Sequence, residues 1–105
     1  MTKRNLSIAV LAFIALIATS LWASYTDLQV SLVGFNANSV TISVHNPQSH
    51  AEAAGVAVGV QYSDNTTESL HSATVTFPAG STRTVTVASA KTIVGIIDDP
   101  EPINP

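Results

Sequence analysis

The sequence predicts an all-β domain of antiparallel strands that follows a single N-terminal membrane helix. Two observations lead to this prediction. Residues 6–23 carry no charge, and their only polar side chains are Ser7, Thr19 and Ser20. From about residue 28 onward, apolar side chains recur at every second position, which is the period of a strand with one buried face.

The apolar segment 6–23 has the length and the flanks of a membrane-spanning helix. A rise of about 1.5 Å per residue makes it roughly 27 Å long, close to a hydrocarbon core of about 30 Å. Lys3 and Arg4 precede it, and basic flanks are retained on the cytoplasmic side. Trp22 and Tyr25 lie at its C-terminal end, and such rings favour the lipid–water interface. We expect a cell-membrane protein, in contact with membrane lipid, with a cytoplasmic N-terminus and an extracytoplasmic C-terminal domain.

Two interpretations of the segment are open, an uncleaved signal anchor and a secretory signal that is removed. A removed signal would end at small residues, either at 18–20 or at 21–23. The apolar run is longer than the usual signal core of about 7–15 residues. Leu21 and Trp22 are bulky and spoil the best cleavage frames. The sequence therefore favours the anchor, with a secreted domain as the alternative.

Six strands are predicted beyond the apolar segment. Their apolar positions alternate with Ser, Thr, Gln or His, or with the small residues Ala57 and Gly59. The expected strands cover residues 28–32, 40–44, 56–62, 73–77, 85–87 and 92–97. The strongest turn signal is Pro78–Ser81. Short, evenly spaced strands without a helical period predict a small antiparallel β-sandwich of immunoglobulin-like type.

The two ends of this domain are expected to differ from its middle. The last strand, 92–97, is apolar on both faces, which predicts that something covers both. Three prolines in the last six residues favour an extended polyproline tail without regular structure. The expected division is therefore a membrane helix or signal anchor at 1–25, a β-sandwich at 26–97 and an acidic, Pro-rich tail at 98–105.

Two resemblances add to these patterns. The passages Val40–Pro47, Gly55–Tyr62 and Thr76–Val87 resemble the late-embryogenesis-abundant type 2 (water-stress) domain, with its strand ending in Asn-Pro and its Pro-x-Gly-Ser turn. This resemblance covers roughly residues 28–90 and implies a sandwich without enzymatic activity. The layout of a basic start, an apolar helix and a Thr- and Val-rich sandwich is similar to archaeal pilins and archaellins, although Asn5 replaces the small residue expected after Lys3 and Arg4.

Composition excludes several function classes. After residue 25 the chain has two basic residues, Arg83 and Lys91, against seven acidic ones, a net charge of −5. So few basic side chains cannot neutralise many phosphates, so we expect no nucleic-acid partner. The chain has no cysteine, which rules out disulfides and thiolate metal sites.

No group of residues forms a catalytic motif. His45, His50 and His71 lack the close spacing of metal ligands, so we interpret them as surface residues and expect no metal or other cofactor. Gly80-Ser81 lies in a turn rather than in a nucleophile elbow. Asp98 and Asp99 lie on the predicted tail, where nothing would hold them at a catalytic separation. We therefore expect no enzyme and no catalytic residues.

One residue is a candidate modification site. Asn65 begins the triplet Asn65-Thr66-Thr67, which fits the N-glycosylation sequon in a predicted extracytoplasmic turn. The alternative is an ordinary turn asparagine, used because Asn tolerates left-handed backbone angles.

The function that follows is that of a non-enzymatic cell-envelope protein that acts through protein–protein contacts. It would be either a pilin-like filament subunit or an accessory subunit of a membrane complex. The alternative is a secreted binding module released after signal cleavage.

Overall fold

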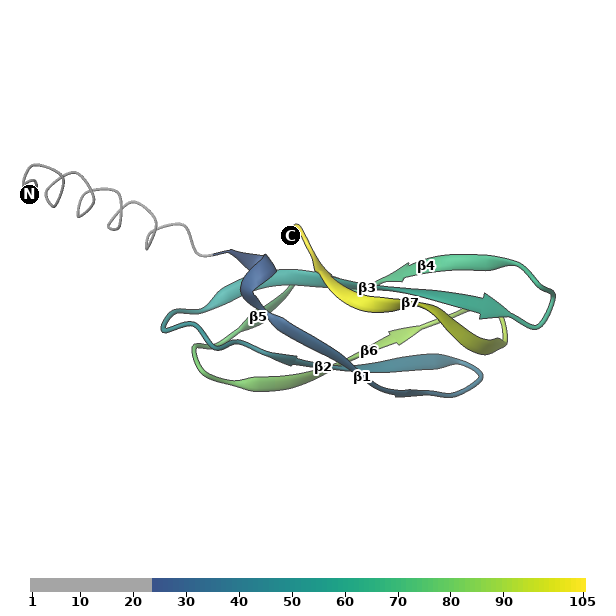
Figure 1. The fold of residues 1–105 in the computed structure, drawn as a ribbon, viewed down its shortest axis with the longest axis horizontal. Helices are drawn as coiled ribbons and strands as arrows, with labels where there is room; N and C mark the ends of the chain where they lie inside the picture. Colours follow the sequence, from purple (N-terminus) through teal and green to yellow (C-terminus); the bar gives the residue numbers. More distant parts are fainter. Residues whose placement is uncertain (1–23) are drawn as a thin grey trace, which may run out of the picture.

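The computed structural model describes residues 24–105, so the predicted membrane helix at 6–23 lies outside the described residues. Among the residues that are described, no helix is long and apolar enough to cross a membrane. The described chain is all-β and its strands pair antiparallel (Figure 1). The predicted fold class is confirmed at that level.

Seven strands and one short 3₁₀-helix make up the fold. They are η1 (Tyr25–Asp27), β1 (Gln29–Phe35), β2 (Ser39–His45), β3 (Glu52–Tyr62), β4 (Thr67–His71), β5 (Val75–Phe77), β6 (Thr82–Ala88) and β7 (Ile93–Ile103). One sheet has the order β1-β2-β6, and the other is built around β3. The two sheets lie one over the other as two layers (Figure 1).

The core lies between the inner faces of the two central strands. Every second residue of β2 is fully buried, and β3 contributes an equally buried run of valines. Tyr62 and Phe77 add the largest buried side chains. The inward positions are Val40, Ile42 and Val44 of β2 and Val56, Val58 and Val60 of β3. The period-2 prediction for these strands is confirmed because both run through the middle of a sheet, where each pleat has one face toward the core.

Strand β3 has partners along both of its edges. On one edge it pairs with β4 over Ala57–Gln61 and then with β5 over Glu52–Ala54. The register between these two pairings shifts by one residue, so β5 continues the line of β4. On its other edge β3 pairs with β7 from Gly55 to Tyr62. The outer face of β3 is therefore flanked by side chains from both neighbours.

The predicted strand list was incomplete at β4. Residues Thr67–His71 form a strand although only Leu70 is apolar and buried. An edge strand needs one inward side chain and otherwise faces water, so it leaves little periodicity in the sequence.

The predicted boundary at residue 97 was wrong. The chain from 98 to 103 is not a separate tail, because β7 runs to Ile103 and pairs Asp98, Glu101 and Pro102 with β3. Prolines are compatible with this position because β7 is an edge strand, whose outward N–H groups need no ladder partner.

At the other end of the described chain, Ser24 and Tyr25 are part of the folded structure. Ser24 caps η1 through a hydrogen bond from Thr26 N to Ser24 Oγ. Tyr25 packs against the hydrophobic core of the described domain. Packing against the core removes apolar surface of the phenolic ring from water, which stabilises the folded domain. The folded domain therefore includes residues 24 and 25.

Asn46, which follows β2, links the end of this strand to the loop before β3 and to the end of β5. It is the one fully buried polar residue of the described chain. Its Nδ2 donates to the carbonyls of His50 at 3.0 Å and Phe77 at 2.9 Å, and its Oδ1 accepts from Gln48 N at 3.0 Å. Strand β2 ends at His45, immediately before Asn46 and Pro47.

Candidate functional site

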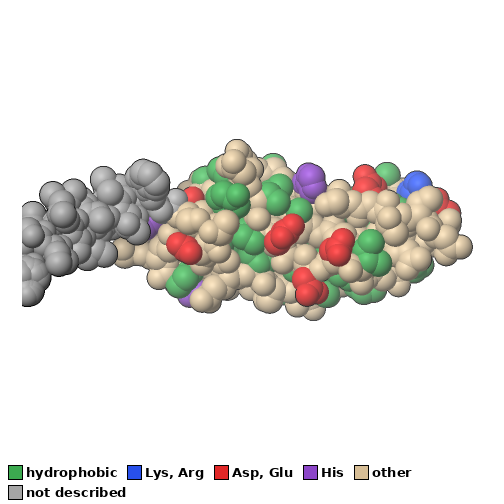
Figure 2. Space-filling model, turned by 45° about the horizontal axis from the view of Figure 1, so that its top comes forward, with side chains coloured by type: hydrophobic (Ala, Val, Ile, Leu, Met, Phe, Trp, Pro, Cys, Tyr) green, Lys and Arg blue, Asp and Glu red, His purple; other side chains and the backbone are tan. Residues whose placement is uncertain are grey.

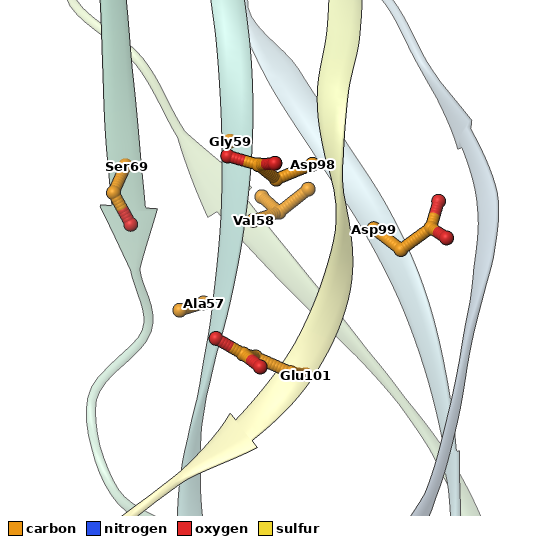
Figure 3. A pocket seen from close by; sticks show the side chains of 7 residues that line it. All are labelled: Ala57, Val58, Gly59, Ser69, Asp98, Asp99 and Glu101. Carbon is orange, nitrogen blue, oxygen red and sulfur yellow. The ribbon is translucent and has the colours of Figure 1, made fainter.

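A shallow groove of about 480 Å³ lies on the outer face of the β4-β3-β7 sheet. Its floor is β3 and its walls come from β4 and β7 (Figure 3). The lining residues are Ala57, Val58, Gly59, Ser69, Asp98, Asp99 and Glu101. The carboxylates of Asp98 and Glu101 lie across β3, whereas the side chain of Asp99 points away from it (Figure 3).

Small residues on β3 make room for these carboxylates. Register places Gly59 opposite Asp98 and Ala57 opposite Glu101. A Cβ added at Gly59 would lie 2.8 Å from both Cβ and Oδ2 of Asp98, closer than van der Waals contact allows. The absence of a side chain at Gly59 is therefore what lets Asp98 lie over the strand. At the far end of the same face Gly55 similarly accommodates Ile103.

The groove can attract cations and accept hydrogen bonds. Two carboxylates face Ser69 across a floor without bulky side chains, and further acidic side chains are spread over the same face (Figure 2). All three acidic residues are exposed to water, so the groove lacks the water-excluded surroundings that raise the strength of electrostatic catalysis. Its chemistry suits ammonium, guanidinium or hydroxyl groups.

The sequence missed this groove because it placed Asp98 and Asp99 on a free tail. The available signal was the run of small residues Gly55, Ala57 and Gly59 on the outer face of a central strand. Such a run is expected where longer neighbouring side chains must lie over the strand.

The three histidines lie apart from the groove and from one another. The ring of His45, at the end of β2, is 2.8 Å from Thr82 Oγ1 on β6. His50 lies in the loop after β2, within 3.1 Å of Gln48 Oε1, and His71 ends β4 beside Ser69. No cluster of three or more His, Asp or Glu side chains that could hold a metal ion occurs between residues 24 and 105.

Asn65 lies in the exposed turn between β3 and β4, as predicted. Its φ of 69° is the only positive value at a residue other than glycine in the described chain. Asn tolerates this left-handed conformation better than most residues. The backbone therefore supplies a reason for asparagine here that is independent of the sequon.

The second notable surface is an apolar strip on β1 and β7, the two strands that lie side by side along one flank of the fold (Figure 1). All large apolar side chains exposed by two fifths or more in residues 24–105 belong to it. They are Leu32 (40 %), Val33 (61 %), Phe35 (45 %), Val94 (54 %) and Ile97 (48 %). We call these five residues the β1/β7 strip.

Bulges explain why three of these side chains face solvent. Val33 interrupts the β1–β2 register, and Val94 and Ile97 interrupt the β3–β7 register. A bulged residue has no partner on the neighbouring strand, and its side chain does not follow the alternation between the two faces of the sheet. The expectation that 92–97 is buried on both faces is therefore corrected within this domain: Ile93 is buried, while Val94 and Ile97 are exposed.

A small charged cluster lies at the Val94 end of the strip. Lys91 Nζ is 3.0 Å from Asp64 Oδ2 and 5.4 Å from the centre of the Tyr62 ring. Hydrogen bonds from the hydroxyl and N–H of Thr66, together with the one from Lys91, lower the pKa of Asp64 to about 2. The hydrogen bond from the Tyr62 hydroxyl to Glu68 raises the pKa of Tyr62 to about 12.

Comparisons of the chain with protein-family models, with curated proteins and with solved structures gave no match.

Proposed function

We propose that this chain is a membrane-anchored, extracytoplasmic domain of immunoglobulin-like sandwich type that acts by binding protein rather than by catalysis. The observation that supports the proposal is the β1/β7 strip. Five exposed apolar side chains lie on two neighbouring strands, and soluble domains usually keep such groups small unless they are interaction sites. The uncharged segment 6–23 supplies the anchor.

The flanks of the strip suit a docking site for protein. Acidic residues Asp98 and Asp99 border it at one end, and the Lys91–Asp64 pair borders it at the other. An apolar centre with a charged rim is the usual composition of a protein interface. Among protein assemblies, a pilin-like filament or an accessory role in a membrane complex fits this layout.

The proposal is tested on the full chain extracted from its native membrane in mild detergent. Native electrophoresis should show the wild type in a complex that Ile97→Asp or Leu32→Asp disrupts, because a charge would be desolvated in the interface. The matched control is Thr84→Asp, at an exposed position on β6, which β2 separates from β1; this variant should leave the complex intact. A wild-type chain that runs alone, or equal loss in all three variants, contradicts the proposal.

A secreted binding module is a second candidate, favoured by the acidic groove. Its carboxylates and Ser69 could bind a polymer rich in hydroxyl or amino groups. The intact mass of the native protein separates the two candidates, because only the anchored form retains residues 1–23.

A further inference from the structure

We infer that the β1/β7 strip binds the same strip of a second copy of this chain, in antiparallel orientation, with Val94 of one copy against Ile97 of the other. This inference rests on the proposed function and names its partner. The first support is the spacing of the strip. Val94 and Ile97 are both bulged, exposed residues of the same strand. A twofold axis midway between them therefore places Val94 of each copy opposite Ile97 of the other copy.

Charge at the two ends of the strip selects the antiparallel orientation. Lys91 lies three residues before Val94, and Asp99 lies two residues after Ile97. When Val94 faces Ile97 of the second copy, Lys91 comes beside Asp99 of that copy. The acidic ends, which carry Asp98, Asp99 and Glu101, are then kept apart. A parallel arrangement would place these acids against their own counterparts, and like charges in contact are unfavourable.

The outward direction of Asp99 supports this arrangement. Asp98 and Glu101 lie over β3, whereas Asp99 points to the opposite side of β7 (Figure 3). Although Asp99 lines the rim of the groove, its carboxylate is directed away from β3, the strand with which β7 pairs. Lys91 at the other end is half-exposed even while paired with Asp64, so it can reach a second carboxylate.

The ladder edge of β7 is poorly suited to strand addition. Its register is interrupted between Tyr62 and Gln61, between Val60 and Gly59 and between Gly59 and Ala57 of β3. Pro100 and Pro102 also lack N–H groups. Bulges and prolines block edge-to-edge hydrogen bonding. The contact between copies is therefore one of side chains, which the exposed Val94, Ile97, Leu32 and Phe35 supply.

The acidic charge of the domain disfavours a lipid surface as occupant of the strip. The chain after residue 25 has a net charge of −5, and anionic headgroups attract basic rather than acidic segments. A second copy carries the same net charge, but it differs from an anionic lipid surface in bringing an apolar strip and Lys91 against the strip and Asp99 of the first copy.

Site-specific cross-linking tests the inference, and the cysteine-free chain makes every introduced thiol unique. Full-length Val94→Cys and Ile97→Cys chains with different epitope tags are co-expressed, and isolated membranes are oxidised. The mixed pair should form a disulfide dimer of twice the chain mass about tenfold more than either variant alone, because a disulfide needs Cβ atoms about 3.5–4.5 Å apart. In the antiparallel contact, identical positions are offset by about 10 Å along the strand.

The matched control pair is Thr84→Cys with Thr86→Cys, both exposed on β6, which β2 separates from β1. A mixed-pair dimer well above this control, with little dimer from each variant alone, supports the inference. Dimer from Val94→Cys alone at the level of the mixed pair overturns the antiparallel orientation. A cross-link from position 94 or 97 to a protein of another mass overturns the second copy while the proposed function stands. Cross-linking no greater than in the control overturns the inference and removes the support for the strip as an interface.

Discussion

The two central strands, β2 and β3, bury their inner faces in one core but differ on their outer faces. On β2 the outer residues Thr41 and Ser43 are partly exposed and polar. On β3 the outer residues Gly55, Ala57 and Gly59 are as buried as the inner ones. The difference comes from the neighbours of β3, since Asp98 and Ile103 of β7 lie close over it. A strand with small outer residues can thus be covered without a third layer of structure.

The largest expected effect comes from Asn46, which joins the end of β2 to the loop that leads into β3. We expect Asn46→Ala to lower the unfolding free energy by about 3 kcal/mol, because several buried backbone groups lose their hydrogen-bond partner at once. Urea melts of the full chain in detergent, followed by circular dichroism, measure the change. The exposed Asn38→Ala serves as the control and should stay within about 0.5 kcal/mol. A similar small change for Asn46→Ala would show that water replaces its contacts.

A smaller effect should distinguish the outer faces directly. Gly59→Ala adds a Cβ that meets Asp98 at 2.8 Å, and we expect a loss of about 1–2 kcal/mol from the displacement of β7. The matched change on β2 is Ser43→Ala, where we expect less than about 0.5 kcal/mol because that face is open to solvent. Equal urea midpoints for the two variants would contradict the difference between the strands.

The smallest effect concerns the turn after β3. The pKa of Asp64 is lowered from 3.8 to about 2 in the folded chain, so the unfolded chain takes up this proton first as the pH falls. The contribution of Asp64 to stability is present above about pH 4 and is lost between about pH 4 and pH 2. Unfolding midpoints measured across this range should fall less steeply in Asp64→Asn than in the wild type. Parallel curves would show that Thr66 and Lys91 do not favour the charged carboxylate in solution.

Central strands were predictable because their side chains obey a strict alternation. Val40, Ile42 and Val44 each face the core in the register that the sequence indicates. Edge strands were harder. Strand β4 contributes one buried side chain, Leu70, and β7 shifts its register three times. A period-2 pattern cannot survive such shifts, since each bulge moves the following residues to the other face.

The sequence by itself determined the all-β class, the two core strands, the turns at Asn65 and Pro78–Ser81, and the negative charge of the domain. These features depend on neighbours along the chain, through alternation, turn chemistry and composition. Only the tertiary structure decided that residues 98–103 pair with β3, that Asp98 and Glu101 border a groove, and that the exposed apolar residues gather on β1 and β7. Each of these depends on which strands become neighbours in space. Long-range pairing is set by the packing of whole faces against each other, and local sequence does not encode it.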